Sequence, residues 1–106
     1  MELVEADLLD EESIIRAAEG CKYIIHVASP FPLEKPKHED LLIKPAVNGT
    51  LAACKAAHKW GAKRLVITAS LASIFYGHDK KKHDFDADTW SIPEKCAAYP
   101  IEHLRL

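Results

Sequence analysis

The sequence feature that most constrains the fold is the short apolar run Leu-Val-Ile at residues 65–67, which is rich in β-branched side chains. Gly61 precedes the run, and Thr68 and Ser70 follow it. This pattern is typical of a strand buried on both faces, the kind from which parallel sheets are built. Ligands of open α/β sheets bind just beyond the carboxyl ends of the strands, so these hydroxyls are candidate ligand contacts. Taken alone, Ser70 is better explained as a capping residue of the turn, because Ser and Thr are common turn residues.

Length and composition indicate one small globular domain. The chain has 106 residues, of which 48% are hydrophobic and 28% are charged, an ordinary balance for such a domain. The formal net charge of -2 does not suggest a nucleic-acid surface or an anionic membrane as a partner. Cys21, Cys54 and Cys96 lack the spacing of metal ligands, and we interpret them as reduced packing residues.

No membrane segment or targeting signal is apparent in the sequence. No apolar run approaches the roughly 20 residues that a membrane span requires. Met1 is followed at once by Glu2 and a strand-like segment rather than by a signal peptide. We therefore expect a cytoplasmic location and no membrane partner.

The apolar periodicity predicts an alternation of strands and helices. Strands are expected at about residues 3–6, 23–27 and 64–68, and helices near residues 11–19 and 44–60. The second and third strands should be adjacent and parallel, because a helical crossover links them. The alternation therefore predicts an α/β fold with right-handed crossovers.

Local signals place the ends of the two helices. Asp10 can cap the first helix, and Gly20 is a natural stop for it. Pro45 falls early in the second helix and is expected in its first turn or at a kink. Gly49 and several alanines of the same helix would allow a close approach to the sheet.

A polar segment at residues 77–88 carries two histidines, His78 and His83, each followed by an aspartate. These side chains could suggest a metal site, but their spacing fits none of the common ones. The lysines of residues 80–82 are typical of an exposed charge run. We therefore predict a solvated loop here and no metal site.

Five short motifs occur in a fixed order along nearly the whole chain. They are Ala6-Asp7-Leu8, Val27-Ala28-Ser29-Pro30, Pro45-Ala46-Val47-Asn48-Gly49-Thr50, Thr68-Ala69-Ser70 and Tyr99-Pro100. In this order the chain resembles the extended short-chain dehydrogenase/reductases of the NAD-dependent epimerase/dehydratase family, most of all the group around the dihydroflavonol and cinnamoyl-CoA reductases. The resemblance implies a partial NAD(P)-binding, Rossmann-type domain over residues 1–106. It would be an incomplete parallel sheet of about three strands with crossover helices, lacking the first two strands and the carboxyl-terminal substrate region.

The resemblance also implies a set of cofactor contacts for NADP or NAD. Asp7 matches the acidic residue that accepts a hydrogen bond from the adenine amino group, with Leu8 beside it. Without the family, Asp7 is as well explained as a turn or cap residue. Ala28 and Ser29 match the strand exit along the cofactor ribose and phosphates, and Thr68 ends the next strand at the same edge.

Two catalytic residues follow from the resemblance, for a small, aromatic or flavonoid-like substrate. Ser70 matches the hydroxyl that polarises the substrate carbonyl, and Tyr99 matches the phenol that delivers the proton as hydride reaches the carbon. A phenol has an ordinary pKa of about 10 and needs a nearby positive charge to work near neutral pH. The family places a lysine four residues after the tyrosine, where this chain has His103.

Two interpretations of different classes remain open. In the first, the chain is part of an NAD(P)-dependent oxidoreductase acting on CH-OH or carbonyl groups. The absent glycine-rich phosphate loop and His103 in place of the catalytic lysine then predict no catalysis by this chain alone. In the second, the chain is a non-catalytic remnant or interaction module that docks onto an intact paralogue through its exposed strand edges.

The family strand order, 3-2-1-4-5-6, raises a question of strand pairing. Residues 2–6 match strand three and residues 23–27 match strand four, which two other strands separate in a complete sheet. The first segment can therefore pair directly with residues 23–27 or stay detached. Buried unpaired backbone groups cost about 1–3 kcal/mol each, so pairing is expected in a compact chain.

Overall fold

The computed structural model describes residues 2–30, 37–38, 40–79 and 84–95, which fall in two compact units, Met1–Thr68 and Ala69–Leu106. The first unit contains α1 (Glu11–Ala17), β1 (Tyr23–His26), α2 (Asp40–Lys59) and β2 (Arg64–Ile67). The second contains the short helix α3 (Ala72–Phe75) and a 3-10 turn at Pro93–Lys95.

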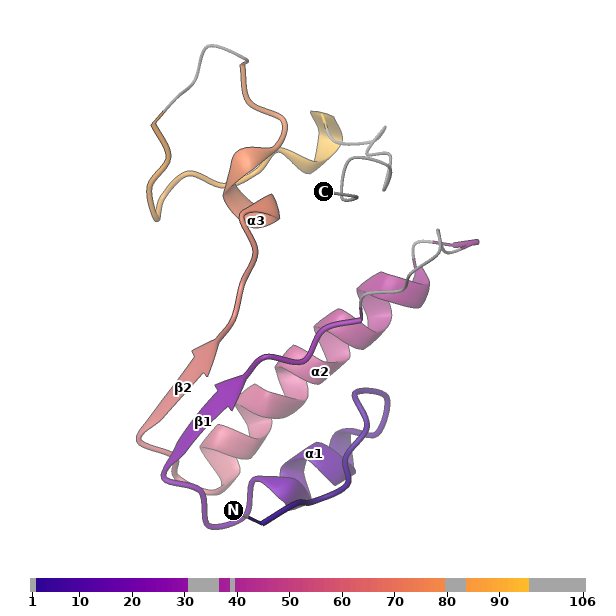
Figure 1. Ribbon diagram of the computed structural model, residues 1–106, viewed down its shortest axis with the longest axis vertical. Helices are drawn as coiled ribbons and strands as arrows, with labels where there is room; N and C mark the ends of the chain where they lie inside the picture. Colours follow the sequence, from indigo (N-terminus) through magenta and orange to yellow (C-terminus); the bar gives the residue numbers. More distant parts are fainter. Residues whose placement is uncertain (1, 31–36, 39, 80–83, 96–106) are drawn as a thin grey trace. The chain divides into compact units, whose positions relative to one another are not determined.

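The sheet of the first unit consists of β1 and β2, which pair in parallel (Figure 1). The register places Tyr23 opposite Arg64 and His26 opposite Ile67. One further bond extends the pairing at its carboxyl end, where the Thr68 N–H donates to the His26 carbonyl at 2.9 Å. The predicted adjacency and direction of these two strands are confirmed, and α2 supplies the crossover.

The sheet packs on α2 through small side chains. Ala52, Ala53 and Ala56 are at most 2% exposed, and α2 contacts both strands as well as α1. Small residues let the helix backbone approach the strands closely, at the cost of a core with little apolar volume. The helix begins at Asp40, earlier than predicted, so that Pro45 lies inside it beyond the first turn.

The predicted first helix is confirmed as α1, although it ends at Ala17 rather than at residue 19. Asp10 caps it, with its carboxylate accepting the Ser13 N–H at 3.2 Å. The indole N–H of Trp60 donates to the Ile15 carbonyl at 2.7 Å and so ties α1 to the end of the α2 segment. Gly20 has a φ of 75°, a left-handed conformation that suits glycine after a helix.

The predicted first strand is wrong. Residues 2–6 form no strand and make no hydrogen bond to β1, and the Leu3 and Val4 side chains are 90% and 56% exposed. The sheet therefore has two strands in the described part of the chain, not about three. A segment of strand-like composition forms a strand only where the edge of another strand lies beside it. The turn after Ala6 is held against α1 instead.

The expectation that the strands are buried on both faces is also wrong. Four apolar side chains on one face of the sheet are exposed. Tyr23 and Ile25 of β1 are 65% and 70% exposed, Val27 just after β1 is 64% exposed, and Val66 of β2 is 48% exposed. Ile24 and Leu65, which pair on the other face, are half-buried. The helices thus cover one face of the sheet and leave an apolar face open.

The second unit is held by hydrogen bonds of the Ser91 backbone and side chain. The Ser91 N–H donates to the Ser73 carbonyl at 2.8 Å, and the Ser91 hydroxyl donates to the Ala72 carbonyl at 2.7 Å. Gly77 has a φ of 82°, and a Cβ at this position would lie 2.7 Å from the Ile92 carbonyl oxygen, so both conformation and space require glycine. Within the predicted polar loop, Phe85 is half-buried, against the expectation of a fully solvated segment.

We predict that the isolated chain is marginally stable. The buried apolar residues in the described part of the chain are Ile15 and three alanines, whereas a domain of this size normally retains only about 5–15 kcal/mol of stability from a much larger core. Calorimetry or circular dichroism should show a broad transition, aggregation or a concentration-dependent midpoint. A monomer with one sharp, reversible transition above about 60 °C would contradict this expectation.

Candidate functional site

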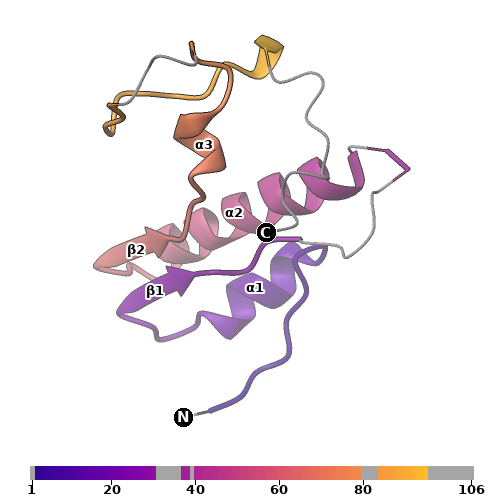
Figure 2. The ribbon, with the colours of Figure 1, turned by 45° about the horizontal axis from the view of Figure 1, so that its top comes forward.

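The carboxyl ends of β1 and β2 define the candidate ligand edge of the first unit. His26 and Ile67 are opposite each other in the parallel ladder, and Thr68 bonds to His26 just beyond it. The segments that follow, with Ala28 and Ser29 after β1, therefore leave the sheet at the same edge as Thr68 (Figures 1 and 2). All three side chains are exposed. The structure thus brings these predicted cofactor residues to one sheet edge, where open α/β sheets bind ligands.

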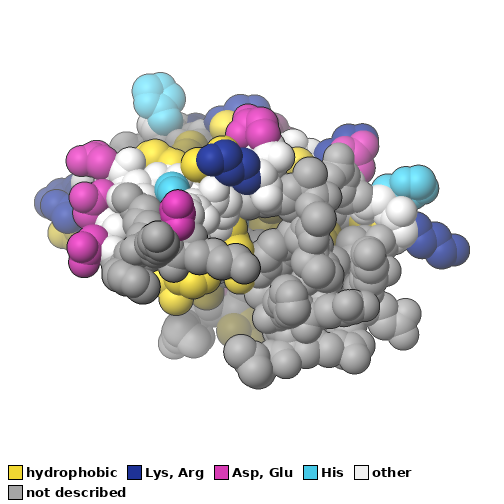
Figure 3. Space-filling model, turned by 90° about the horizontal axis from the view of Figure 1, so that it is seen from above, with side chains coloured by type: hydrophobic (Ala, Val, Ile, Leu, Met, Phe, Trp, Pro, Cys, Tyr) yellow, Lys and Arg dark blue, Asp and Glu magenta, His cyan; other side chains and the backbone are white. Residues whose placement is uncertain are grey.

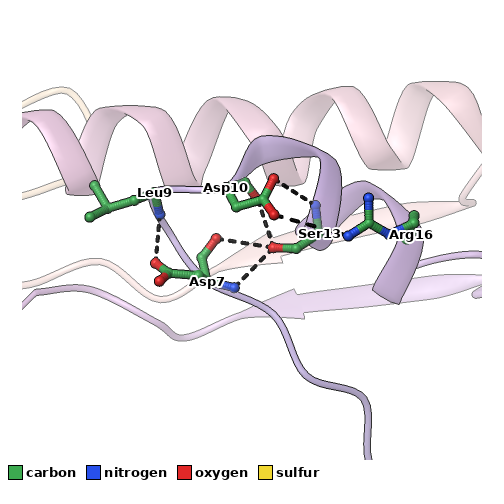
Figure 4. A network of polar contacts seen from close by, with 5 residues as sticks. All are labelled: Asp7, Leu9, Asp10, Ser13 and Arg16. Carbon is green, nitrogen blue, oxygen red and sulfur yellow. Dashed lines mark hydrogen bonds and ion pairs between the residues drawn. The ribbon is translucent and has the colours of Figure 1, made fainter.

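The segment around Asp7 is a tight turn at the start of α1 (Figure 4). One carboxylate oxygen of Asp7 accepts the Leu9 N–H at 2.8 Å, and the Asp7 carbonyl accepts the Asp10 N–H at 3.0 Å. The first is the bond of an Asx turn and the second is the main-chain bond of a β-turn, so both agree with the interpretation of Asp7 as a turn residue. The Asp7 side chain is nevertheless exposed, and its second carboxylate oxygen has no hydrogen bond within the described residues.

Ser13 is the residue that fixes this turn, and the sequence did not single it out. Its hydroxyl accepts the Asp7 N–H at 2.9 Å and donates to the Asp10 carbonyl at 2.7 Å. The side chain is buried, with 7% exposure. The signal that could have found it is the Asp-x-x-Ser spacing at a helix start, because a serine hydroxyl in the first turn can bond the backbone that precedes the helix.

Leu8 lies against α2 rather than beside an open ligand surface. It is half-buried, and a Cβ added at Gly49 would collide with the Leu8 Cδ2 atom. Gly49 therefore provides the space into which Leu8 packs. This contact anchors the Asp7 turn on α2, and it connects two motifs that lie far apart in the sequence.

Ser70 belongs to the second unit, where it begins the turn into α3. Its hydroxyl oxygen accepts the Ala72 N–H at 3.2 Å, and its carbonyl accepts the Ser73 hydroxyl at 2.6 Å. The first of these is the bond expected of a capping residue. The Ser70 side chain remains exposed, and its hydroxyl hydrogen is available for a second partner. Tyr99 and His103 lie outside the described residues.

The described residues contain neither a cluster of metal-ligating side chains nor a helix that could span a membrane. Within residues 2–30, 37–38, 40–79 and 84–95, no three or more His, Cys, Asp or Glu side chains gather in a way that could hold a metal ion. No helix in the same residues is both long and apolar enough to span a membrane. Figure 3 shows acidic and basic side chains scattered among each other on the face that it displays. Cys21 and Cys54 are free and exposed, so their predicted role in packing is wrong.

The two parallel strands and the crossover helix form a small α/β fragment, which is consistent with part of a Rossmann-type sheet. A model of the 3-beta hydroxysteroid dehydrogenase/isomerase family matches residues 1–101. The chain belongs to this family, and the resemblance to extended short-chain dehydrogenase/reductases is confirmed.

Curated relatives agree with this assignment. The chain is 36% identical over 94 residues to a bifunctional dihydroflavonol 4-reductase/flavanone 4-reductase of Malus domestica, covering 89% of this chain and 27% of the relative. It is 31% identical over 103 residues to tetraketide alpha-pyrone reductase 1 of Arabidopsis thaliana, covering 95% and 32%. A dihydroflavonol 4-reductase of Gerbera hybrida is 34% identical over 92 residues, covering 86% and 25%. The chain thus spans about a quarter to a third of the length of these relatives.

We predict that Ser13→Ala loosens the Asp7 turn. The change removes the acceptor of the Asp7 N–H and the donor to the Asp10 carbonyl, each worth about 0.5–1.5 kcal/mol. Hydrogen exchange followed by NMR should show faster exchange of the Asp7 amide. Ser29→Ala, at an exposed position, is the matched control and should leave this amide unchanged. Equal protection of Asp7 in all three proteins would contradict the role given to Ser13.

Proposed function

We propose that this chain is a central portion of the NAD(P)-binding domain of a reductase that acts on a carbonyl or CH-OH group of a small, flavonoid-like substrate. The observation that carries the proposal is the family match over residues 1–101. Two of the relatives described above are reductases of dihydroflavonols, and a third is named for a tetraketide α-pyrone. The strand-end edge with Ala28, Ser29 and Thr68 supports it, since a cofactor of this fold lies along that edge.

The residues present fit the adenosine end of such a cofactor. The free carboxylate oxygen of Asp7 can accept a hydrogen bond from an amino group, and the small side chain of Ala28 would let a ribose approach the backbone. The pyrophosphate has no matching loop in this chain, because its four glycines, Gly20, Gly49, Gly61 and Gly77, form no G-x-G-x-x-G pattern. The nicotinamide of NADP or NAD would supply the hydride.

The proposed catalytic roles belong to Ser70 and Tyr99. The Ser70 hydroxyl would donate to the substrate carbonyl oxygen, and the Tyr99 phenol would transfer a proton to that oxygen as negative charge develops. His103 stands where a permanently charged lysine would support the phenolate. Histidine is largely neutral near pH 7, so this support is weak. We therefore propose that the chain alone does not turn over.

The second candidate function is a non-catalytic module that docks onto an intact paralogue. The open apolar sheet face favours this alternative, because Ile25 and Val27 are 70% and 64% exposed. Contiguous exposed apolar side chains of this kind often mark interaction surfaces. The two proposed functions make different predictions about cofactor binding. In a reductase the strand-end edge binds a nicotinamide cofactor when the rest of the protein is present, whereas in a docking module it does not.

We predict no measurable reductase activity for the purified chain. Oxidation of NADPH or NADH should stay at background with aldehydes, ketones and a dihydroflavonol, because the chain has no phosphate loop and carries His103. Tyr99→Phe is the control for any residual signal. Turnover that requires Tyr99 would overturn this prediction.

A chimera tests the proposed family role directly. We expect the Malus domestica reductase, with its matched segment replaced by the corresponding residues of this chain, to bind the nicotinamide cofactor. Asp7→Ala in the chimera should weaken binding about tenfold, the effect of losing one hydrogen bond of roughly 1.4 kcal/mol. Leu9→Ala, at the exposed neighbouring position, should not. A folded chimera whose cofactor affinity ignores Asp7 would contradict the adenine assignment.

A further inference from the structure

Ser91 makes three hydrogen bonds to the short helix α3 and its C-cap within the second unit. Its N–H donates to the Ser73 carbonyl at 2.8 Å, and its hydroxyl donates to the Ala72 carbonyl at 2.7 Å. The same hydroxyl oxygen accepts the N–H of the C-cap residue Tyr76 at 2.9 Å. Figure 1 shows the segment of residues 84–95 passing beside α3. One half-buried side chain therefore bonds to both ends of this helix.

The helix α3 needs bonds from outside, because it is a single turn. It consists of four residues, and the side chain of its N-cap, Leu71, makes no capping hydrogen bond. Forming the first helical turn fixes the conformation of several residues for one hydrogen bond, so a turn of this length is unstable by itself. The hydroxyl of Ser91 thus contributes directly to holding this turn together.

The same helical turn holds Ser70. The Ala72 N–H donates to the Ser70 hydroxyl oxygen at 3.2 Å, and the Ser73 hydroxyl donates to the Ser70 carbonyl at 2.6 Å. Ala72 therefore connects two serines that lie far apart in the sequence. Its N–H bonds to the hydroxyl of Ser70, and its carbonyl accepts the hydroxyl of Ser91. A change at Ser91 thus reaches Ser70 through one intervening residue.

Local contacts on both sides fix where Ser91 meets α3. Before it, the Thr89 hydroxyl and N–H both donate to Asp86, at 2.6 and 3.1 Å, and so close a tight turn. After it, the Ile92 N–H donates to the carbonyl of the α3 C-cap residue at 3.0 Å. Gly77 leaves the space that the Ile92 carbonyl occupies. The position of Ser91 is therefore set by its neighbours as well as by its own bonds.

We propose that Ser91 is a positioning residue for the reductase reaction, because it fixes the α3 turn that holds the Ser70 hydroxyl in one orientation. This inference rests on the catalytic role proposed for Ser70 above. The Ser70 oxygen accepts the Ala72 N–H, which leaves the hydroxyl hydrogen for donation to a substrate carbonyl. A donor to a developing negative charge is most effective when it is held in place before the reaction. Loss of the Ser91 hydroxyl would leave the Ser70 hydroxyl less well oriented.

Substitutions in a second chimera test the role of Ser91. Residues 65–95 of this chain replace the corresponding residues of the Malus domestica reductase, so that the rest of the enzyme remains that of the host. Ser91→Ala should lower kcat for the dihydroflavonol about tenfold and leave the KM for the nicotinamide cofactor unchanged, because a small displacement of a catalytic group slows the reaction. Ser91→Thr keeps a hydroxyl and should retain most of the kcat. Asp88→Ala, at an exposed position of the same segment, is the control and should have no effect.

A double substitution separates this role from a general loss of stability. With Ser70→Ala already present, Ser91→Ala should lower kcat no further, because the group that it positions is gone. Effects that multiply, or an unchanged kcat for Ser91→Ala where Ser70→Ala lowers it, would overturn the positioning role and leave the proposed function standing. An unchanged kcat for Ser70→Ala would overturn the catalytic assignment of Ser70 and the positioning role with it.

Hydrogen exchange followed by NMR on the chain itself checks the link independently of activity. The Ala72 amide, which bonds to the Ser70 hydroxyl oxygen, should exchange faster in Ser91→Ala than in the unsubstituted chain. Asp88→Ala should leave this amide unchanged. Equal exchange of the Ala72 amide in all three proteins would contradict the connection from Ser91 through α3 to Ser70.

Discussion

The parallel pairing of β1 with β2 is the interaction on which the first unit depends. Two parallel strands cannot be joined by a tight turn, so the chain must cross over the sheet before the second strand can begin. The crossover is α2, and its buried alanines let the helix axis come close to the strands. The same requirement brings both carboxyl strand ends to one edge, where Ala28, Ser29 and Thr68 lie. The candidate ligand edge is therefore a consequence of the pairing.

The sequence predicted the elements whose signals are local. The Asp10 cap, the stop at Gly20 and the β-branched run of residues 65–67 each specify a boundary or a strand within a few residues, and α1, α2, β1 and β2 follow from them. The sequence could not predict features that depend on distant partners. Residues 2–6 have strand composition, but a strand exists only where a neighbouring edge is available. The packing of Leu8 on Gly49 joins positions that no local pattern connects.

The proposed ligand residues show why local and functional interpretations need not exclude each other. Asp7 uses one carboxylate oxygen for the Leu9 N–H, and Ser70 uses its hydroxyl oxygen as an acceptor for Ala72. Each group keeps further hydrogen-bonding capacity, an oxygen in one case and a hydroxyl hydrogen in the other. The turn bonds also limit the side-chain conformations, which lowers the entropic cost of binding. A capping bond is thus compatible with ligand recognition and does not argue against it.

The outer edge of β1 and the uncovered face of the sheet are two separate features, and different interactions would complete each of them. Within the described residues the outer edge of β1 has no strand partner, and in a complete sheet of this order a further strand pairs there. The face lacks apolar cover, since Tyr23, Ile25 and Val27 are each more than 60% exposed. Full burial of a large apolar side chain contributes about 1.5–3 kcal/mol. A neighbouring strand therefore completes the edge through main-chain bonds, whereas the face requires a layer of apolar side chains over it.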